Sequence, residues 1–468
     1  MEDRGVNPGA RPMKKSKKNT ENQLKVIENR NIFLKLSKYE MPEQGVSPKD
    51  TCDIIRSELQ TQGNPALNMA SFVTTIMDKE CDEIIHENLG VNYIDTEVYR
   101  GNLEVEERCV KILGNLFSAP DINKVWGTQC VGSSEALMLA VLAHKRAWKA
   151  QRKAAGKPFD NPNIVMGNDV HLTWVKAAIY FEIEQRIIPL SEKRYTVTAE
   201  EVLERVDENT ICVVGVLGTS YTFDYDPIES INDALVELKG TQGLDIPLHV
   251  DGASGAFIAP FLNPEIRWDF QLEQVKTINT SGHKYGLVYP GIGWALWRDE
   301  SDIPKELVTE TNVLGFVEKS FSLNFSRGGA MILAQYYNFL RLGKEGYTRI
   351  LNNLREIARY LAEQLAELDE IEVLRSAEFT PSVIIKLKSE GSFNAADLVA
   401  ALAVHGWVIP AFSLPANADH VNVMRLNVKE QFNGELADRL VADMKAALAK
   451  LSDIHKRPYE KVRNYHPR

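Results

Sequence analysis

Residues 280–286, TSGHKYG, place Lys284 on a turn bounded by glycines. The turn lies between two strand-like runs, VKTIN at 275–279 and GWALW at 293–297. Burying an ammonium group costs free energy unless the group is paired or used chemically. A desolvated lysine loses its proton readily and becomes a nucleophile. By itself the pattern fits a structural lysine that extends from a loop to solvent equally well.

A second motif upstream favours the chemical interpretation. At residues 248–255, LHVDGASG, an apolar strand-like run ends in Asp251. An aspartate at the carboxyl end of one strand and a lysine after a later strand fit the pyridoxal phosphate arrangement. There the lysine carries the cofactor covalently, and the carboxylate keeps the pyridinium nitrogen protonated, which makes the ring an electron sink. The pair therefore predicts catalytic roles for Lys284 and Asp251.

These motifs resemble those of the group II pyridoxal-phosphate amino-acid decarboxylases, and the closest branch is the glutamate decarboxylases of bacteria and plants. The likeness runs from about residue 67 to about 425 and includes GSSEA at 132–136, WDF at 268–270 and NFSR at 324–327. It implies an α/β protein of pyridoxal-phosphate fold type I (aspartate aminotransferase-like), with a large, mostly parallel sheet domain and a smaller C-terminal α+β domain. It also implies pyridoxal 5'-phosphate as cofactor and α-decarboxylation of L-glutamate to 4-aminobutyrate and CO2.

The bulk composition agrees with a soluble enzyme. Of 468 residues, 44% are hydrophobic and 25% charged, which is enough to build a sizeable core. A net charge of −10 argues against nucleic acid as the main partner. No apolar run reaches the roughly 18 residues of a membrane span, and the first residues lack the apolar core of a secretory signal. Five cysteines without a CxxC pair indicate neither disulfides nor a metal site. We expect a cytoplasmic enzyme that acts on a small amino acid.

Three regions are expected along the chain: an N-terminal arm and helical segment (1–65), a large cofactor-binding domain (66–353) and a small C-terminal domain (354–468). The first 30 residues are polar, with clustered lysines, which favours a mobile arm. A contact with a partner or an acidic surface is the functional alternative. Ser47 followed by Pro48 predicts a helix start. Apolar runs that alternate with helical patterns indicate a doubly wound domain.

Residues 132–134, GSS, lead into a predicted helix over 135–155. Small residues and hydroxyls at a helix N-terminus form a phosphate site, because free N–H groups and the helix dipole point outward. We therefore predict Ser133 and Ser134 as ligands of the cofactor phosphate, whereas an ordinary N-cap would explain only one serine. The resemblance adds His283, as a support of the phosphate, to this set.

The resemblance also implies further cofactor contacts. His171 corresponds to a histidine that stacks on the pyridoxal ring in the wider family, although bacterial glutamate decarboxylases usually have glutamine there. An ordinary structural histidine is the alternative. Ser220 is expected near the phenolic oxygen of the ring, and Ala253 and Ser281 beside the cofactor. Ser326 resembles the residue that reaches the phosphate across a subunit interface, which implies a homodimer or a higher homo-oligomer.

Four residues are implied as substrate ligands by the same match. Ser71, the backbone of Phe72, and Asp95 correspond to the stretches that bind the distal carboxylate, and Ser71 stands where the family often has threonine. An aspartate facing a carboxylate requires that one of them be protonated, which would favour activity at acidic pH. Arg425, in a predicted strand, matches the arginine that grips the α-carboxylate. A helix cap or turn (Ser71, Asp95) and an exposed strand arginine are the alternatives.

Two positions leave the outcome open. Val313 stands where glutamate decarboxylases tend to place a tyrosine thought to help protonate the α-carbon. Because of this departure, two alternatives remain: a decarboxylase of aspartate or cysteine sulfinate, and an aldehyde-forming relative. A catalytically silent partner subunit is a further alternative, against which Lys284, Asp251 and Arg425 argue together. His466, near the end of the chain, resembles a histidine that closes the site at neutral pH in some bacterial relatives, and a frayed end is the alternative.

Overall fold

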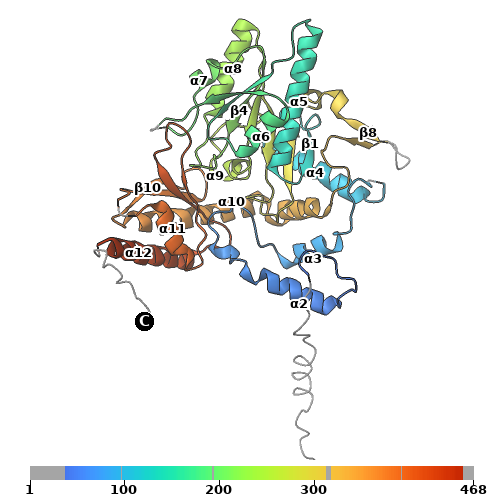
Figure 1. The fold of residues 1–468 in the computed structure, drawn as a ribbon. Helices are drawn as coiled ribbons and strands as arrows, with labels where there is room; N and C mark the ends of the chain where they lie inside the picture. Colours follow the sequence, from blue (N-terminus) through green and yellow to red (C-terminus); the bar gives the residue numbers. More distant parts are fainter. Residues whose placement is uncertain (1–36, 96, 192–193, 312–317, 392, 457–468) are drawn as a thin grey trace, which may run out of the picture. The chain divides into compact units, whose positions relative to one another are not determined.

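Figure 1 shows the computed structural model, which describes residues 37–95, 97–191, 194–311, 318–391 and 393–456. The chain divides into two compact units, Met1–Gln62 and Gly63–Arg468. In the first unit, α2 (Pro48–Glu58) begins as predicted, because the Ser47 hydroxyl accepts a hydrogen bond from the N–H of Asp50. A 3-10 turn, Leu59–Thr61, follows. Among the described residues, no helix is long and apolar enough to cross a membrane.

A seven-stranded sheet forms the core of the second unit, in the order β1-β7-β6-β5-β4-β2-β3. The strands are β1 (Trp126–Cys130), β2 (Asn163–Gly167), β3 (Glu184–Ile188), β4 (Thr210–Val216), β5 (Leu248–Asp251), β6 (Val275–Thr280) and β7 (Gly293–Trp297). Neighbouring strands from β3 to β6 pair in parallel, whereas β7 is antiparallel to both β6 and β1. The prediction of a mostly parallel sheet is confirmed.

Helices cover both faces of this sheet. On β2, Ile164 and Met166 pack with α5 (Ser133–Ala154) and α6 (Leu172–Tyr180). Val165 between them belongs to the other main cluster, which includes the apolar face of α8 (Ile228–Gln242). Successive side chains point to opposite faces of a strand, so a strand buried on both faces needs an unbroken apolar run. This is why the runs in β2 and β4 could be recognised.

The remaining helices of the second unit connect or flank the sheet. They are α3 (Lys79–Glu87), α4 (Arg100–Leu116), α7 (Ala199–Leu203), α9 (Ala259–Leu262) and α10 (Ala330–Ala366), with 3-10 turns at Pro65–Leu67, Gly255–Phe257, Glu300–Asp302 and Lys305–Leu307. β8 (Thr309–Thr311) and β9 (Glu318–Ser320) pair as a two-stranded antiparallel sheet. The backbone of α10 departs from helical geometry at Gly343, where φ is +57°. The expected domain boundary at 353/354 therefore falls inside one long, kinked helical element.

A four-stranded antiparallel sheet, in the order β10-β11-β13-β12, follows α10. Its elements are β10 (Ile371–Ser376), β11 (Ser382–Leu387), α11 (Ala395–Ala403), β12 (Ala411–Ser413), β13 (Asn422–Asn427) and α12 (Gly434–Lys456). One face packs with the main cluster through Met424, whereas Val423 on the other face packs with Phe223. Since Arg425 lies two positions from Val423, it shares the face that is turned toward Phe223.

Candidate active site

A cavity of about 210 Å³ lies where the carboxyl ends of β4, β5 and β6 meet the N-terminus of α5. Parallel strands of a doubly wound sheet present their carboxyl ends at one edge, which is where such folds bind ligands. Nine of the residues predicted from the sequence line this cavity: Ser133, Ser134, His171, Ser220, Asp251, Ala253, Ser281, His283 and Lys284. The fold therefore gathers side chains that are up to 151 residues apart in the sequence (284 − 133).

Lys284 lies on the turn after β6, and its Nζ donates a hydrogen bond to the Ser254 hydroxyl at 3.3 Å. The Phe72 ring centroid lies 5.1 Å from the same nitrogen. Desolvation lowers the pKa of Lys284 to about 8, although the Asp251 carboxylate partly opposes this effect. Within the described residues, the ammonium forms no ion pair within 4 Å of a carboxylate. Near neutral pH this lysine therefore holds its extra proton weakly, as an amine nucleophile must.

Asp251 ends β5 as a buried carboxylate that accepts three hydrogen bonds. Its donors are the indole N–H of Trp174 at 2.7 Å, the side-chain amide of Asn279 at 3.0 Å and the backbone N–H of Ala253 at 3.1 Å. These bonds hold both carboxylate oxygens in place at the cavity wall. A carboxylate held in this way suits a protonated pyridine nitrogen.

Hydrogen-bond donors line the part of the cavity at the N-terminus of α5. The hydroxyls of Ser133 and Ser281 lie 2.7 Å apart, and those of Ser134 and Thr173 lie 3.1 Å apart. Ser133 is the first residue of α5, whose free N–H groups and dipole attract an anion. Nδ1 of His283 is buried with no hydrogen-bond partner among the described residues. Burial lowers the pKa of His283 to about 4, so the ring is neutral.

Gly132 allows the close approach that this end of the cavity requires. A Cβ at position 132 would lie 2.8 Å from Cε1 of His283. We therefore predict that Gly132→Ala displaces His283 and lowers the affinity of the apoprotein for pyridoxal phosphate by about tenfold, the effect of one or two lost hydrogen bonds. A fluorescence titration with the cofactor measures this. Gly240→Ala is the control, since a Cβ there meets nothing within 4 Å, and equal affinities for the two variants would contradict the prediction.

His171 is the N-cap of α6 and lines the same cavity. Its Nδ1 accepts a hydrogen bond from the Thr173 N–H at 3.2 Å and lies 2.8 Å from the Thr173 hydroxyl. Partial desolvation of the ring lowers the pKa of His171 below its ordinary value, although the residue as a whole is exposed. Because Nδ1 accepts the Thr173 N–H, the ring proton lies on Nε2, and the cap holds the ring in one orientation.

The segment that carries Ser71 and Phe72 lies between Lys284 and the small sheet. The Thr74 hydroxyl donates to the Lys284 carbonyl at 2.9 Å, and the Asn427 side chain donates to the Ala70 carbonyl at 3.1 Å. The Ser71 hydroxyl accepts from the N–H of Val73 at 3.1 Å. This turn places Phe72 against Lys284, so the segment contributes directly to the surroundings of the lysine.

Arg425 reaches the same place from β13. Its guanidinium donates to the carbonyls of Ser220 and Ala70, the latter at 2.9 Å, and lies 4.9 Å from the Phe72 ring centroid. Its Nε is buried without a partner, and no carboxylate of the described residues forms an ion pair with it. Desolvation lowers the pKa of Arg425 to about 10, so it remains charged at neutral pH. A desolvated, unpaired guanidinium is a strong carboxylate-binding group.

Asp95 and Ser326 do not line this cavity. They lie on two segments joined by an antiparallel bridge between Asn92 and Gly328, next to the hydrogen bond from the Tyr93 N–H to the Arg327 carbonyl. Ser71, Phe72 and Arg425 do not line the cavity either, but Phe72 and Arg425 lie near Lys284, whereas Asp95 and Ser326 lie on two adjacent segments. Val313 and His466 are outside the described residues.

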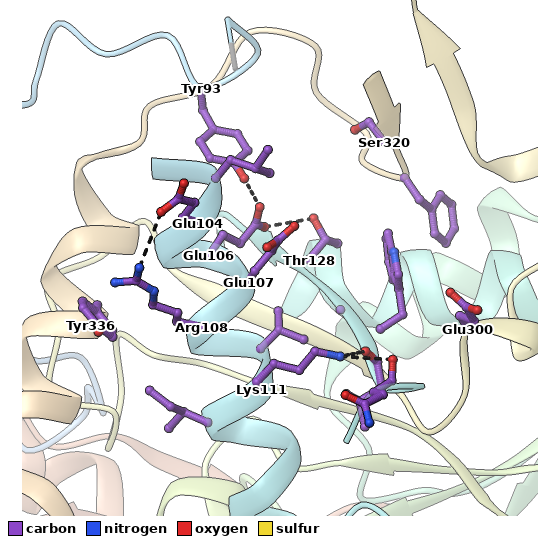
Figure 2. A pocket seen from close by; sticks show the side chains of 18 of the residues that line it. Tyr93, Glu104, Glu106, Glu107, Arg108, Lys111, Thr128, Glu300, Ser320 and Tyr336 are labelled. Carbon is purple, nitrogen blue, oxygen red and sulfur yellow. Dashed lines mark hydrogen bonds and ion pairs between the residues drawn. The ribbon is translucent and has the colours of Figure 1, made fainter. Parts of the chain in front are cut away.

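A larger cavity, of about 850 Å³, lies beside α4 and the edge strand β1 (Figure 2). Glu106 accepts hydrogen bonds from the Tyr93 hydroxyl and from the N–H of Gln129, the latter at 2.6 Å. Lys111 donates to the carbonyls of Ile122 and Val125 at 2.6 and 2.9 Å. These charged side chains form hydrogen bonds with backbone groups of the edge strand β1 and of the segment just before it. Without them these backbone groups would remain unpaired. We therefore assign them a structural role.

Asp169 forms a buried carboxyl pair with Asp226 close to His171. Both oxygens of Asp169 lack a hydrogen-bond partner among the described residues, whereas Asp226 accepts from the N–H groups of Val216 and Val197 at 2.7 and 3.2 Å. Burial raises the pKa of Asp169 to about 6, and burial together with repulsion from Asp169 raises that of Asp226. Because N–H donors favour a charged carboxylate, we assign a proton to Asp169 and the negative charge to Asp226.

This pair predicts a pH-dependent stability. A folded-state pKa above the ordinary value of Asp169 contributes stability at low pH that is lost as the pH rises through about 6. The variant Asp169→Asn lacks this loss. When the pH rises from 4 to 8, the free energy of unfolding of the variant should therefore increase by about 2 kcal/mol relative to that of the wild type. Urea denaturation at both pH values measures the gain. Asp369→Asn, at an exposed position, should show none, and a pH-independent difference for Asp169→Asn would refute the assignment.

Several residues around the cavity were not predicted from the sequence. Trp174 and Asn279 bind Asp251, Thr173 orients His171, and Ser254 binds Lys284. One signal was available: in β6 the polar residues Thr277 and Asn279 lie two positions apart, on either side of the apolar Ile278. Polar side chains on one face of a buried strand indicate a hydrogen-bonded network on that face.

The lysine, the anchored carboxylate and the donor-rich helix N-terminus match the three chemical ends of pyridoxal 5'-phosphate: its aldehyde, ring nitrogen and phosphate. Their position at the edge of a mostly parallel sheet, followed by a small antiparallel domain, defines a pyridoxal-phosphate enzyme of fold type I. The chain belongs to the pyridoxal-dependent decarboxylase family, because the model of the "Pyridoxal-dependent decarboxylase conserved domain" matches residues 40–388. It is therefore a pyridoxal-phosphate-dependent carboxy-lyase.

Known proteins agree with this assignment. The chain is 43% identical to glutamate decarboxylase 1 of Arabidopsis thaliana over 93% of this chain and 87% of the relative. It is 41% identical to a glutamate decarboxylase of Aliivibrio fischeri, with 90% and 91% covered. Among solved structures, a Lactobacillus brevis glutamate decarboxylase matches with a TM-score of 0.87 and 35% identity, covering 91% of this chain and 96% of that one.

Proposed function

We propose that this protein removes the α-carboxylate of L-glutamate and forms 4-aminobutyrate and CO2. The geometry that supports this is a charged Arg425 that has no carboxylate partner among the described residues and lies over the same Phe72 ring as Lys284, next to the cavity that Lys284 and Asp251 line. The substrate follows from glutamate decarboxylases 41–43% identical to this chain over at least 90% of its length.

The bound cofactor supplies an electron sink for the pair released when the carbon–carbon bond breaks. Arg425 would bind the α-carboxylate by a bidentate fork and so fix the orientation of the substrate. Asp251 would hold a proton on the ring nitrogen, and His171, which lines the same cavity, would pack against the ring. Lys284, whose pKa lies near 8, holds or releases a proton at Nζ beside the reacting carbon.

The distal carboxylate of glutamate is bound at the segment that includes residue 72. The N–H of Phe72 makes no hydrogen bond within the described part of the chain, and the Ser71 hydroxyl retains a hydrogen to donate. Asp95 contributes the acid that shares a proton with this carboxylate. Activity should therefore increase at acidic pH.

Asp95 belongs to a second subunit in this proposal, as does Ser326. Both lie outside the cavity of their own chain and on adjacent segments, so one neighbouring copy would supply both. The functional unit is then a homodimer with two shared sites.

Mixed dimers test this arrangement. Chains with Lys284→Ala are combined with chains with Asp95→Ala under conditions that exchange subunits. If Asp95 acts in the partner's site, half of the dimers are hybrids with one intact site of two, so activity returns to about a quarter of the wild type. If both residues serve the same site of one chain, the mixture remains inactive.

Substrate identity is tested by product analysis with purified protein, added pyridoxal phosphate and a panel of acidic amino acids at pH 4.5 and 7. The proposal expects 4-aminobutyrate and CO2 in equal amounts from glutamate. Preference for aspartate or cysteine sulfinate, or release of an aldehyde, would contradict glutamate decarboxylation and support the alternatives that Val313 suggests.

The proposed compartment is the cytoplasm. All five cysteines are free, and four of them are buried, as expected of a protein that folds in a reducing environment. Cell fractionation with an antibody against the protein tests this, and recovery with secreted material would contradict it.

A further inference from the structure

A continuous chain of hydrogen bonds runs from Asp251 into the interior of the sheet. Asn279 donates to Asp251 at 3.0 Å, and its amide oxygen lies 2.7 Å from Nε2 of His249. Nδ1 of His249 lies 2.7 Å from the Thr277 hydroxyl, which lies 2.7 Å from Nε2 of His144 on α5. The middle three residues are fully buried, and the two ends are at most 7% exposed. The three residues beyond Asn279, namely His249, Thr277 and His144, have no role in the catalysis proposed so far.

The direction of every bond in this chain follows from the carboxylate. Asp251 accepts only, so the Asn279 NH2 group faces it and the Asn279 oxygen faces His249. Nε2 of His249 must then carry a hydrogen, and its Nδ1 accepts the Thr277 hydroxyl proton. The Thr277 oxygen in turn accepts from Nε2–H of His144. The other four residues are thereby aligned with their donors pointing toward Asp251.

The electrostatics agree with this alignment. Desolvation lowers the pKa of His249 to about 4, and desolvation, together with the repulsion that a protonated His249 and Lys276 would exert, lowers the pKa of His144 to about 3. Both rings are therefore neutral. The Trp174 ring, whose N–H binds the other oxygen of Asp251, packs edge-on against His249 with centroids 4.9 Å apart. The charge at the inner end of the chain is thus the carboxylate alone.

We propose that Thr277 and His249 are positioning residues that act on the cofactor through Asn279 and Asp251. Aligned neutral donors fix the orientation of the carboxylate and polarise the hydrogen bond that it receives. The chain thereby sets how strongly Asp251 holds a proton on the cofactor's ring nitrogen. The inference rests on the pyridoxal phosphate site and is independent of which amino acid is the substrate.

The proposal predicts effects that decrease along the chain. His144, at the outer end, also lines a separate cavity of about 240 Å³, and its Nδ1 has no hydrogen bond to any described residue. Its replacement by glutamine, whose amide can still donate to Thr277, should change cofactor affinity less than twofold. Removal of the Thr277 hydroxyl breaks the chain nearer to Asp251 and should have a larger effect.

Thr277→Val and Thr277→Ser provide the matched test, since valine keeps the shape and serine keeps the hydroxyl. In Thr277→Val we expect cofactor affinity and kcat to fall by about three- to tenfold, the effect of one lost hydrogen bond, with KM for glutamate unchanged within twofold. The pH midpoint of the bound-cofactor absorption should also shift. Thr277→Ser should restore all of these values within twofold. Wild-type cofactor affinity and pH midpoint in Thr277→Val, or equal damage in both variants, would overturn the proposal.

Nitrogen NMR of the unmodified protein labelled at histidine gives a second, independent test. The resonances of His249 and His144, assigned by their loss in His249→Gln and His144→Gln, should both report neutral rings with the proton on Nε2. A doubly protonated His249, or a proton on Nδ1 of either ring, would reverse the Thr277 hydroxyl and refute the alignment. Neither this test nor the cofactor titration depends on turnover of glutamate, so they remain decisive if another substrate is found.

Discussion

Replacing Lys284 with alanine is expected to lower kcat by about four orders of magnitude or more, because it removes the nucleophile that would hold the cofactor. Arg425 and Asp251 would keep their own hydrogen bonds in this variant. The variant should therefore fold and bind pyridoxal phosphate more weakly and without a covalent bond. Absorption spectra before and after borohydride reduction, together with the rate of CO2 release, measure both effects.

Lys276 is the matched control for this prediction. It lies on β6 eight positions before Lys284 (284 − 276) and outside the cavity. Lys276→Ala should retain a reducible cofactor bond and activity within threefold of the wild type. If Lys284→Ala retains more than about 1% of the activity, or if Lys276→Ala loses the cofactor bond instead, Lys284 is not the attachment point.

The conservative substitution Arg425→Lys is expected to lower kcat/KM for glutamate by roughly 10²- to 10³-fold. Loss of a charged partner from a buried pair with a carboxylate typically costs about 2–5 kcal/mol, and a lysine cannot form the same fork. The charge is kept, so the loss reports geometry. The carbonyls of Ser220 and Ala70 that now hold the guanidinium would also lose donors. Steady-state kinetics at fixed saturating cofactor measure the change.

Arg439 is a suitable comparison because it also lies over an aromatic ring, that of Trp407, but on α12 and half exposed. Arg439→Lys should change kcat/KM less than twofold. Cofactor affinity should be nearly the same in both variants, since Arg425 does not line the cofactor cavity. A fall in cofactor affinity that matched the fall in kcat/KM for Arg425→Lys would contradict a substrate-binding role.

The core of the large sheet was predictable because its strands are buried on both faces. Residues 211–216 in β4, for example, form an unbroken apolar run, and the structure buries all seven residues of the strand. The edge strand β1, with the sequence WGTQC, was not predicted. A side chain of α4 forms a hydrogen bond with the backbone at the free edge of β1, so this strand needs no continuous apolar run. Long-range pairing of this kind leaves little local signal.

The cavity was predictable only in part. Lys284 and Asp251 belong to motifs whose chemistry is unusual for a turn and a strand end, and both line the cavity. Trp174 and His249 were missed, because an aromatic residue on a helix and a histidine in a strand are ordinary core residues until their partners are known. Asp95 was predicted as a site residue from resemblance alone, and in its own chain it lies away from the cavity.

By itself the sequence determined the chemistry of the site: a lysine on a glycine-bounded turn, an aspartate at a strand end, and serines at a helix start. These features are local, because they depend on residue type and on the backbone of a few neighbours. The tertiary structure decided which residues from distant parts of the sequence surround these groups. Only folding brings Phe72 and Arg425, 353 residues apart (425 − 72), beside Lys284, and leaves the guanidinium without a carboxylate partner in the described part of the chain. The desolvation that lowers the pKa of Lys284 comes from such distant contacts, and no short stretch of sequence contains it.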